Sequence, residues 1–243
     1  VFFFETPANP TLDVVDMEFV CGLAKSRGIV TVVDNAFATS ALQKPMDFGA
    51  DVVAYSATKL MDGQGRVLAG AVCGSKEWID EVLLPFQRNT GPNIAPFNAW
   101  VVLKGLETLS LRAEKQSANA VALGEAIEGR KLAMRHPGLP SHPRHALALK
   151  QMTATGPVFA FDVGSRETAF AVLDGLELID LSNNIGDSRS LMCHPASTTH
   201  AGMTADARAE MGVSEGLLRI NVGLEDVADL IEDLDRALDK AGL

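Results

Sequence analysis

Cysteine, basic residues and long apolar runs are all scarce in this 243-residue sequence, and each shortage counts against a class of protein. Cys21, Cys73 and Cys193 are scattered without the spacing of a metal site, so we expect no disulfides and a reducing, cytoplasmic location. Lysine and arginine number 21 against 31 acidic side chains, and the formal net charge is −10. That balance disfavours nucleic acid or an anionic membrane as the main partner. No apolar run approaches the ~20 residues that cross a bilayer.

Nucleotide-binding and metal-binding motifs are missing as well. Neither G-x-G-x-x-G nor a P-loop is present, which disfavours a nucleotide-binding α/β module. His142 and His145 have a spacing seen in metal sites, but they lie in the proline-rich stretch 136–145, which is expected to be a surface loop without cysteine or a carboxylate cluster. We therefore expect no bound metal. His194 and His200 bracket the sequence PASTT, and we expect both to form structural hydrogen bonds.

The sequence begins with VFFFETPANPT, an apolar run without a methionine. Residues 1–4 predict a buried strand. A signal peptide would show a basic leader and a longer apolar segment, and neither is present. Since domains seldom begin in mid-strand, we expect a further segment of protein to precede Val1.

Alternating strand and helix patterns predict an α/β fold with a mainly parallel sheet. Residues 29–35 (IVTVVDN) and 51–56 (DVVAYS) are near-continuous apolar strands, and residues 13–27 place apolar side chains on one helical face. Strands of this kind, buried on both faces, are typical of parallel sheets. Ligands bind beyond the carboxyl ends of such strands, and both Asp34 and Lys59 fall there.

The second half of the chain repeats the alternation after a long helical stretch at 98–129. Strands are predicted at 157–163, 177–182 and 216–223, and an amphipathic helix closes the chain. We therefore expect two domains. Residues 1–115 form the C-terminal part of a large cofactor-binding domain, and residues 116–243 form a smaller α/β domain.

The stretch YSATKLMDGQGR places Lys59 where a strand ends and small residues begin. A lysine at the edge of a partly dry pocket loses its charge easily and can form an imine with an aldehyde. The hydroxyls of Ser56 and Thr58 could bind a phosphate, and Asp34, on a neighbouring strand, could keep a pyridinium nitrogen protonated. These are the protein's parts of a pyridoxal phosphate site. The alternative is a surface lysine in a turn and a capping aspartate.

Four segments together resemble the Cys/Met-metabolism family of pyridoxal phosphate enzymes: ETPANPTLDVVD, VVDNAFAT, YSATKLMDGQGR and LLRINVGLEDVADLIEDLDRAL. That family includes cystathionine synthases and lyases, methionine γ-lyase and the homoserine-ester sulfhydrylases. The resemblance runs in order from Glu5 to the C-terminus. It implies the type I pyridoxal phosphate-dependent transferase fold, which is aspartate-aminotransferase-like, and pyridoxal 5′-phosphate as the cofactor.

The resemblance also implies roles for single residues. Lys59 matches the Schiff-base lysine, and Asp34 matches the carboxylate on the pyridine nitrogen. Ser56 and Thr58 match the phosphate-binding hydroxyls that flank the lysine. Asn9 matches the asparagine near the cofactor's ring hydroxyl and the substrate carboxylate.

Two further matches concern the substrate. Arg219 matches the arginine that holds the substrate α-carboxylate, and its planar guanidinium suits a partner with two oxygens. An arginine inside the apolar strand LLRINV would be a poor choice for a surface salt bridge. Where the family usually reads Ser-Leu-Gly, this chain reads Asn-Ile-Gly, and Asn184 is expected near the substrate carboxylate. For Asn9 and Ser56, ordinary turn capping is the alternative.

The family's phosphate-binding glycine loop, its stacking tyrosine, and the tyrosine and arginine that reach the neighbouring subunit's phosphate precede the region matched here. We therefore expect this chain to correspond to the C-terminal two-thirds of such an enzyme.

The segments TGPNIAPFNAWVVLKGLETLSLR and LSNNIGDSRSLMCHPASTTH are most similar to the O-succinylhomoserine sulfhydrylase branch. This similarity implies γ-replacement by a homotetramer, a dimer of dimers. Sulfide displaces succinate from O-succinyl-L-homoserine to give homocysteine for methionine biosynthesis. Cystathionine γ-synthase activity, or elimination by a methionine or cystathionine γ-lyase, would use the same residues. A non-enzymatic alternative is an inactive fragment that contributes only an assembly surface.

Overall fold

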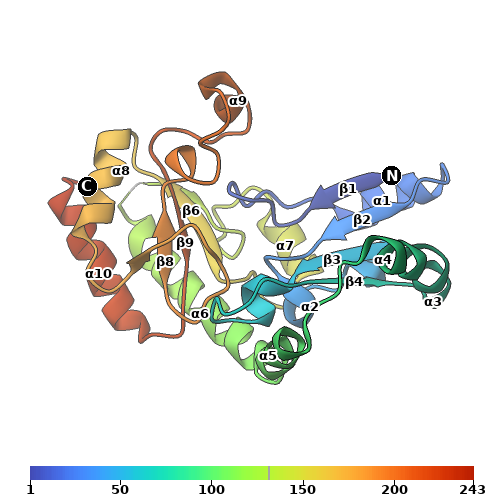
Figure 1. Cartoon of the computed structure of the whole chain (residues 1–243). Helices are drawn as coiled ribbons and strands as arrows, with labels where there is room; N and C mark the ends of the chain where they lie inside the picture. Colours follow the sequence, from blue (N-terminus) through green and yellow to red (C-terminus); the bar gives the residue numbers. More distant parts are fainter. Residues whose placement is uncertain (131) are drawn as a thin grey trace.

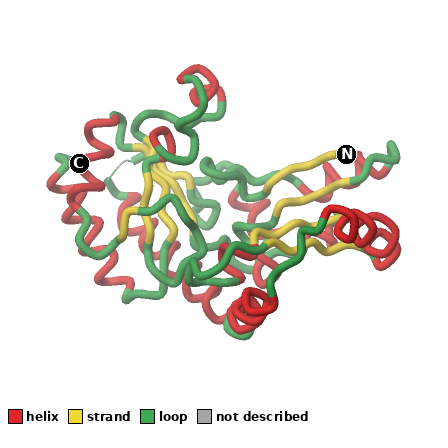
Figure 2. Tube along the Cα trace, viewed as in Figure 1, coloured by secondary structure: helices red, strands yellow, loops and turns green. Residues whose placement is uncertain are grey.

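Two β-sheets form the two halves of the molecule, and helices lie between and around them (Figure 1). The structure is a computed structural model that describes residues 1–130 and 132–243. Figure 2 shows the strands as two separate groups, with the N-terminus beside one group and the C-terminus beyond the other.

The first sheet has the strand order β1-β2-β3-β4. Its strands are β1 (Phe2–Glu5), β2 (Thr31–Asp34), β3 (Val52–Ser56) and β4 (Gly70–Gly74). The first three pair in parallel, and β4 pairs antiparallel with β3. The valines of β2 and β3 favour this extended, buried backbone. The prediction of an α/β fold with a mainly parallel sheet is therefore confirmed for this half.

Short helices surround the first sheet. They are α1 (Met17–Lys25), α2 (Thr39–Leu42), the 3₁₀ turn η1 (Pro45–Phe48), the π-helical turn η2 (Ala57–Met61), α3 (Lys76–Trp78), η3 (Ile79–Leu83), α4 (Leu84–Thr90) and α5 (Pro96–Leu106). The helix predicted at 13–27 is shorter in the structure, because Asp16 caps it by accepting a hydrogen bond from the Phe19 backbone N–H at 3.0 Å.

The second sheet has the order β5-β6-β9-β8-β7 and is mainly antiparallel. Its strands are β5 (Ala133–Arg135), β6 (Val158–Asp162), β7 (Asp180–Leu181), β8 (Leu191–Cys193) and β9 (Leu217–Asn221). The remaining helical segments are α6 (Leu109–Glu128), α7 (His145–Gln151), α8 (Arg166–Gly175), η4 (Pro195–Ser197), α9 (Ala205–Glu210) and α10 (Val227–Lys240). Of these, α7 packs against the first half, where Ala148 shares a core cluster with Leu42. The strand predicted at 177–182 is reduced to two residues, and β5 and β8 were not predicted.

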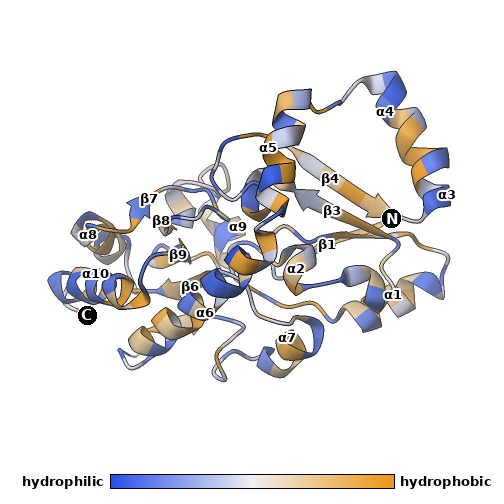
Figure 3. Cartoon of the chain, turned by 90° about the horizontal axis from the view of Figure 1, so that it is seen from below, coloured by the Kyte–Doolittle hydropathy of each residue, from blue (hydrophilic) through white to orange (hydrophobic). Residues whose placement is uncertain are grey.

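Helix α6 packs on both halves. Ala113 belongs to a core cluster with Leu42 of α2, whereas Leu123 and Ile127 belong to the cluster beneath β6, β9, α8 and α10. In Figure 3 the inner face of α10 is hydrophobic and its outer face hydrophilic, as expected for a helix that covers a sheet. The boundary predicted at 115/116 falls inside α6, and the division into two domains stays a prediction.

Two predictions of burial are wrong. Phe2 and Phe3 are 49% and 63% exposed in the 243-residue chain, on strand β1 at the edge of its sheet. The stretch 136–145 is not simply a surface loop, since His136 and Leu139 are fully buried. No helix of the described chain has the length and apolar character that crossing a membrane requires.

His136 is a buried titratable group in the second half. Its ring stacks on Phe159, with 5.0 Å between the ring centroids, and its Nδ1 accepts a hydrogen bond from the Gly138 backbone N–H at 2.9 Å. Burial, with a smaller contribution from His142 and His145, lowers the pKa of His136 from 6.5 to about 4. The folded protein therefore holds this imidazole neutral.

This burial predicts a pH-dependent loss of stability. Between pH 6.5 and about 4 the unfolded chain binds a proton at this histidine and the folded chain does not, so the free energy of unfolding falls as the pH falls. The contribution is about 3 kcal/mol when fully developed. Urea unfolding of wild type and His136→Gln at pH 7, 5.5 and 4.5 tests it. The stability difference between the two proteins should shrink toward low pH, and a constant difference would contradict the prediction.

Candidate active site

Polar side chains collect beyond the carboxyl ends of β2 and β3. Asp34 ends β2, Ser56 ends β3, and Lys59 follows in the π-helical turn η2. Because β2 and β3 are parallel neighbours, both strand ends lie at one edge of the sheet. The structure therefore brings Asp34 and Lys59 to the edge where the sequence predicted them.

The amine of Lys59 is half-buried and faces the other half of the molecule. Its Nζ donates a hydrogen bond to Oδ1 of Asn184 at 2.5 Å. Burial lowers the pKa of Lys59, and the positive charge of Arg219 lowers it further. An amine with a lowered pKa is more readily available as a nucleophile and as a base.

The loop that carries Asn184 packs directly on the backbone around Lys59. Gly186 has a φ of +75°, and a Cβ at this position would lie 2.3 Å from the Leu60 nitrogen. Only glycine fits such a close approach. The Ser188 N–H also donates to the Gly63 carbonyl at 2.8 Å. These contacts bring Asn184 and Lys59 together.

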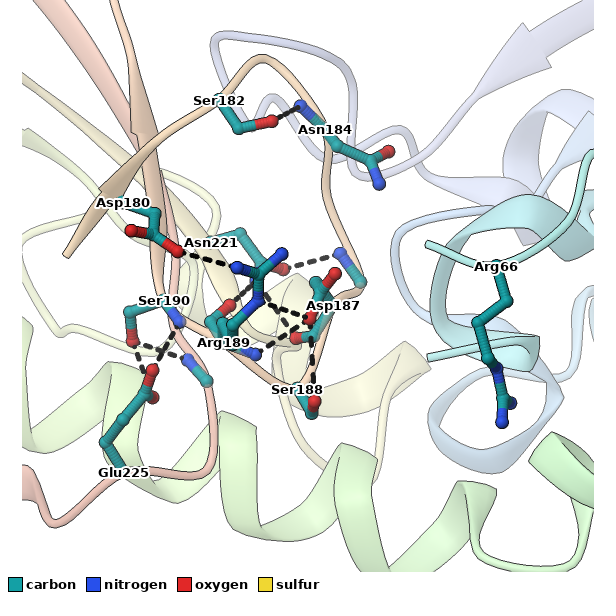
Figure 4. A network of polar contacts seen from close by, with 12 residues as sticks. Arg66, Asp180, Ser182, Asn184, Asp187, Ser188, Arg189, Ser190, Asn221 and Glu225 are labelled. Carbon is teal, nitrogen blue, oxygen red and sulfur yellow. Dashed lines mark hydrogen bonds and ion pairs between the residues drawn. The ribbon is translucent and has the colours of Figure 1, made fainter. Parts of the chain in front are cut away.

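A buried amide on β9 holds this loop in place. Asn221 Oδ1 accepts from the Gly186 N–H at 2.7 Å, and Asn221 Nδ2 donates to the carbonyls of Asp187 and Arg189 at 3.3 and 3.2 Å. Figure 4 shows these bonds, with the side chain of Asn184 pointing away from Asn221. From α6, Gln116 Nε2 adds a bond to the Asp187 carbonyl at 2.7 Å.

Arg219 lies two residues before Asn221 on β9 and is 3% exposed. Its Nη1 donates to Oδ1 of Asn9 at 2.8 Å, and its Nη2 donates to the backbone carbonyl of Asn183 at 2.8 Å. The guanidinium is thereby fixed from both sides, close enough to Lys59 to affect the pKa of the amine. The structure thus brings four residues that the family resemblance named into one cluster: Asn9, Lys59, Asn184 and Arg219.

A second carboxylate accompanies Asp34. Glu5 of β1 is in register with Asp34 of β2, and its Oε2 accepts from the Asn9 backbone N–H at 3.0 Å. Burial raises the pKa of Glu5, the charge of Asp34 raises it further, and Arg219 opposes the rise. Asp34 itself accepts from the Ala36 N–H at 2.9 Å. Sequence reasoning missed Glu5, although it ends a strand as Asp34 does.

The two hydroxyls near Lys59 differ in their surroundings. Thr58 Oγ1 donates to the Ala69 carbonyl at 3.3 Å and accepts from the Ala69 N–H at 2.9 Å, so this hydroxyl ties η2 to the start of β4. Ser56 does not cap the turn that follows it and remains half-buried at the end of β3. Phosphate binding by either hydroxyl stays a prediction.

Arg112 of α6 is a further buried residue that sequence reasoning missed. Its guanidinium donates to the carbonyls of Leu60 and Gly105 at 2.9 and 2.8 Å, and to Thr108 Oγ1 at 3.1 Å. It therefore holds the backbone carbonyl of Leu60, the residue that follows Lys59. The sequence shows only an arginine in the helical run TLSLRA. The structure shows that its side chain is buried.

The amine, carboxylate and hydroxyl groups of this site match what pyridoxal phosphate needs from a protein. The cofactor needs a primary amine for its aldehyde, an acid for its ring nitrogen and hydrogen-bond donors for its phosphate. Lys59 supplies a half-buried amine with a lowered pKa, and Asp34 supplies a carboxylate at the same sheet edge. Ser56 supplies a hydroxyl beside them.

The comparisons with known proteins agree with this site. The model of the Cys/Met metabolism PLP-dependent enzyme family matches residues 1–239. O-succinylhomoserine sulfhydrylase of Mycobacterium tuberculosis (strain H37Rv) is 49% identical over 243 residues, which cover 97% of this chain and 60% of the relative. L-methionine gamma-lyase of Porphyromonas gingivalis is 41% identical over 242 residues, covering 98% and 61%.

The similarity extends to three dimensions. Cystathionine gamma synthase from Xanthomonas oryzae pv. oryzae, solved in complex with aminoacrylate and cysteine, superposes with a TM-score of 0.95 at 42% identity. The match covers 99% of this chain and 63% of that structure. The chain thus spans about 60% of the length of the curated relatives it matches. It has the type I fold of pyridoxal phosphate enzymes, and it belongs to the Cys/Met metabolism family of PLP-dependent enzymes.

Proposed function

We propose that the full-length protein catalyses γ-replacement on O-succinyl-L-homoserine with sulfide, giving homocysteine and succinate. The observation that carries this proposal is the hydrogen bond between Lys59 and Asn184 beside the buried Arg219. It supports the proposal because a reaction on an amino acid needs a base, here Lys59, near a group that can bind a carboxylate, here Arg219. The 49% identity to an O-succinylhomoserine sulfhydrylase supports the choice of substrate.

In this proposal Arg219 binds the substrate α-carboxylate with N–H groups of its planar guanidinium. Asn9 and the Asn183 carbonyl keep the plane of the guanidinium fixed while the substrate binds. Lys59 and Asp34 would hold the cofactor aldehyde and ring nitrogen, Asn9 would lie near the ring hydroxyl, and Ser56 and Thr58 would bind the phosphate. When bound, pyridoxal phosphate supplies a ring that withdraws electrons from the substrate α-carbon.

Lys59 then acts on the substrate's protons. Its neutral amine removes the proton from Cα and passes protons between the substrate carbons, and the lowered pKa of the amine favours the form that accepts a proton. The Cγ–O bond breaks and succinate leaves with the electron pair. The Cγ–S bond forms to hydrosulfide (HS⁻), whose proton stays on sulfur in the product thiol, and the proton taken from Cα returns to a substrate carbon. Asn184 Oδ1 accepts a hydrogen bond from the amine and would keep the amine near the substrate carboxylate.

The experiment that tests the reaction is product identification with the full-length protein. O-succinyl- and O-acetyl-homoserine are each incubated with sulfide or with cysteine, and L-methionine is incubated alone. We expect homocysteine and succinate to form fastest, from the succinyl ester and sulfide. Cystathionine from cysteine would instead assign a cystathionine γ-synthase, and methanethiol from methionine would assign a γ-lyase.

Lys59→Ala should lower turnover by about a thousandfold, because the site loses its general base. The variant should still bind the cofactor through other contacts, but borohydride should no longer fix it to the protein. In reduced wild type, mass spectrometry should find the cofactor mass on the peptide that contains Lys59. Lys104→Ala, which removes an exposed lysine of α5, is the matched control. A cofactor mass on the peptide of Lys44, Lys76 or Lys104 would overturn the assignment of Lys59.

We also propose that the protein assembles with further copies of itself into a homotetramer in a reducing cytoplasm. Large apolar side chains on α5 support this, since Phe97 and Trp100 are 70% and 54% exposed and lie on one helix face with ring centroids 6.0 Å apart. The three cysteines are free thiols, as expected in a reducing compartment.

Light scattering of the full-length protein should give the mass of four copies. The double variant Phe97→Glu, Trp100→Glu should shift the assembly to smaller species, because charges would enter the apolar contact. Leu149→Glu, a change at a similarly exposed leucine of α7, should leave the mass unchanged. A wild-type monomer would reject the proposed assembly.

A further inference from the structure

We propose that Glu5 is a positioning residue for Arg219: its carboxylate fixes the backbone of Asn9, and Asn9 in turn orients the guanidinium. The inference rests on the proposed function, in which that guanidinium receives the substrate carboxylate. It assigns a role to a half-buried charged group that the reaction itself does not use.

The first contact joins the end of β1 to the segment that follows it. Glu5 Oε2 accepts a hydrogen bond from the Asn9 backbone N–H at 3.0 Å, closing the stretch ETPAN on itself. Pro7 within this stretch has no N–H to donate, so the Asn9 N–H is one of few donors that can close it. The carboxylate thereby fixes the position of the Asn9 backbone, from which the side chain extends toward Arg219.

The second contact leads from Asn9 to the other half of the molecule. Asn9 Oδ1 accepts from Arg219 Nη1 at 2.8 Å, while Arg219 Nη2 is held by the Asn183 carbonyl. A guanidinium is planar, so two fixed nitrogens determine the direction of its remaining N–H groups. If Asn9 moves, the N–H groups of Arg219 that would bind a carboxylate change direction.

Glu5 acts on Arg219 in two ways that an experiment must separate. One is the hydrogen bond to Asn9, and the other is the negative charge itself, which lies close to both Asp34 and Arg219. A glutamine at position 5 keeps an acceptor oxygen at the same distance and removes the charge. An aspartate keeps the charge and is one methylene too short to reach the Asn9 N–H.

The variants Glu5→Gln, Glu5→Asp and Glu5→Leu are prepared in the full-length protein. Arg219→Leu is the reference, and Glu77→Leu, at an exposed acid of α3, is the control. The kinetic constants kcat and KM are measured with the homoserine ester that wild type uses best. Amide hydrogen exchange of Asn9 is measured on the same proteins without cofactor, which gives a reading independent of activity.

We expect Glu5→Asp and Glu5→Leu to raise KM about tenfold with kcat changed less, and to accelerate exchange of the Asn9 amide. Glu5→Gln should have a KM and an Asn9 amide exchange rate near the wild-type values. Glu77→Leu should change neither quantity. Unchanged KM and unchanged Asn9 exchange in Glu5→Asp and Glu5→Leu would overturn the proposal, as would a KM in Glu5→Gln as high as in Glu5→Leu.

Failure of the proposed function gives a different result. If Arg219→Leu leaves KM unchanged, the carboxylate site at Arg219 is rejected. The positioning role of Glu5, which depends on that site, is then rejected as well. If Arg219→Leu raises KM strongly while Glu5→Asp and Glu5→Leu do not, the carboxylate site stands and only the role of Glu5 is rejected.

Discussion

The close approach of Gly186 to the backbone of Lys59 is the contact on which the site depends. A Cβ at Gly186 would lie 2.3 Å from the Leu60 nitrogen and 2.7 Å from the Lys59 carbonyl carbon, so any side chain would push the loop away. The positive φ of Gly186 adds a second reason for glycine. This packing brings Asn184 of one half onto Lys59 of the other. A second contact between the halves, from Arg219 to Asn9, holds the guanidinium near the same place.

The apolar strand β9 carries two buried polar side chains, Arg219 and Asn221, and both have hydrogen-bond partners in the loop beside it. Burial of an unpaired charge costs several kcal/mol, and a buried amide without partners costs about 1–3 kcal/mol. Asn221 avoids the second cost through its bonds to the loop backbone, and Arg219 reduces the first through hydrogen bonds to the neutral oxygens of Asn9 and Asn183. Arg219 and Asn221 are two residues apart on β9, so both face the loop while Leu218 and Ile220 face the core. The strand thus separates core packing from the site by alternation alone.

The sequence predicted the parts of the fold whose signals are local. Continuous valine-rich runs identified β2 and β3, and the amphipathic period identified α10. The two-residue β7 and the three-residue β5 and β8 escaped because their pairing depends on neighbours far along the chain. Lys59, Asp34 and Arg219 stood out because a charge beside or within an apolar strand is conspicuous, and the family resemblance supplied the roles that remain predictions. Glu5, Gln116 and Asn221 could not, because an acid or amide in a sequence does not reveal which backbone groups it will meet.

Electrostatics links substrate binding to the basicity of Lys59. Burial and the charge of Arg219 both lower the pKa of the amine, in the direction that helps it form a covalent bond to an aldehyde. In the proposed function, a substrate carboxylate would pair with Arg219 and offset one of these two causes. The charge of Arg219 would then act on both the carboxylate and the amine, and this couples the two groups.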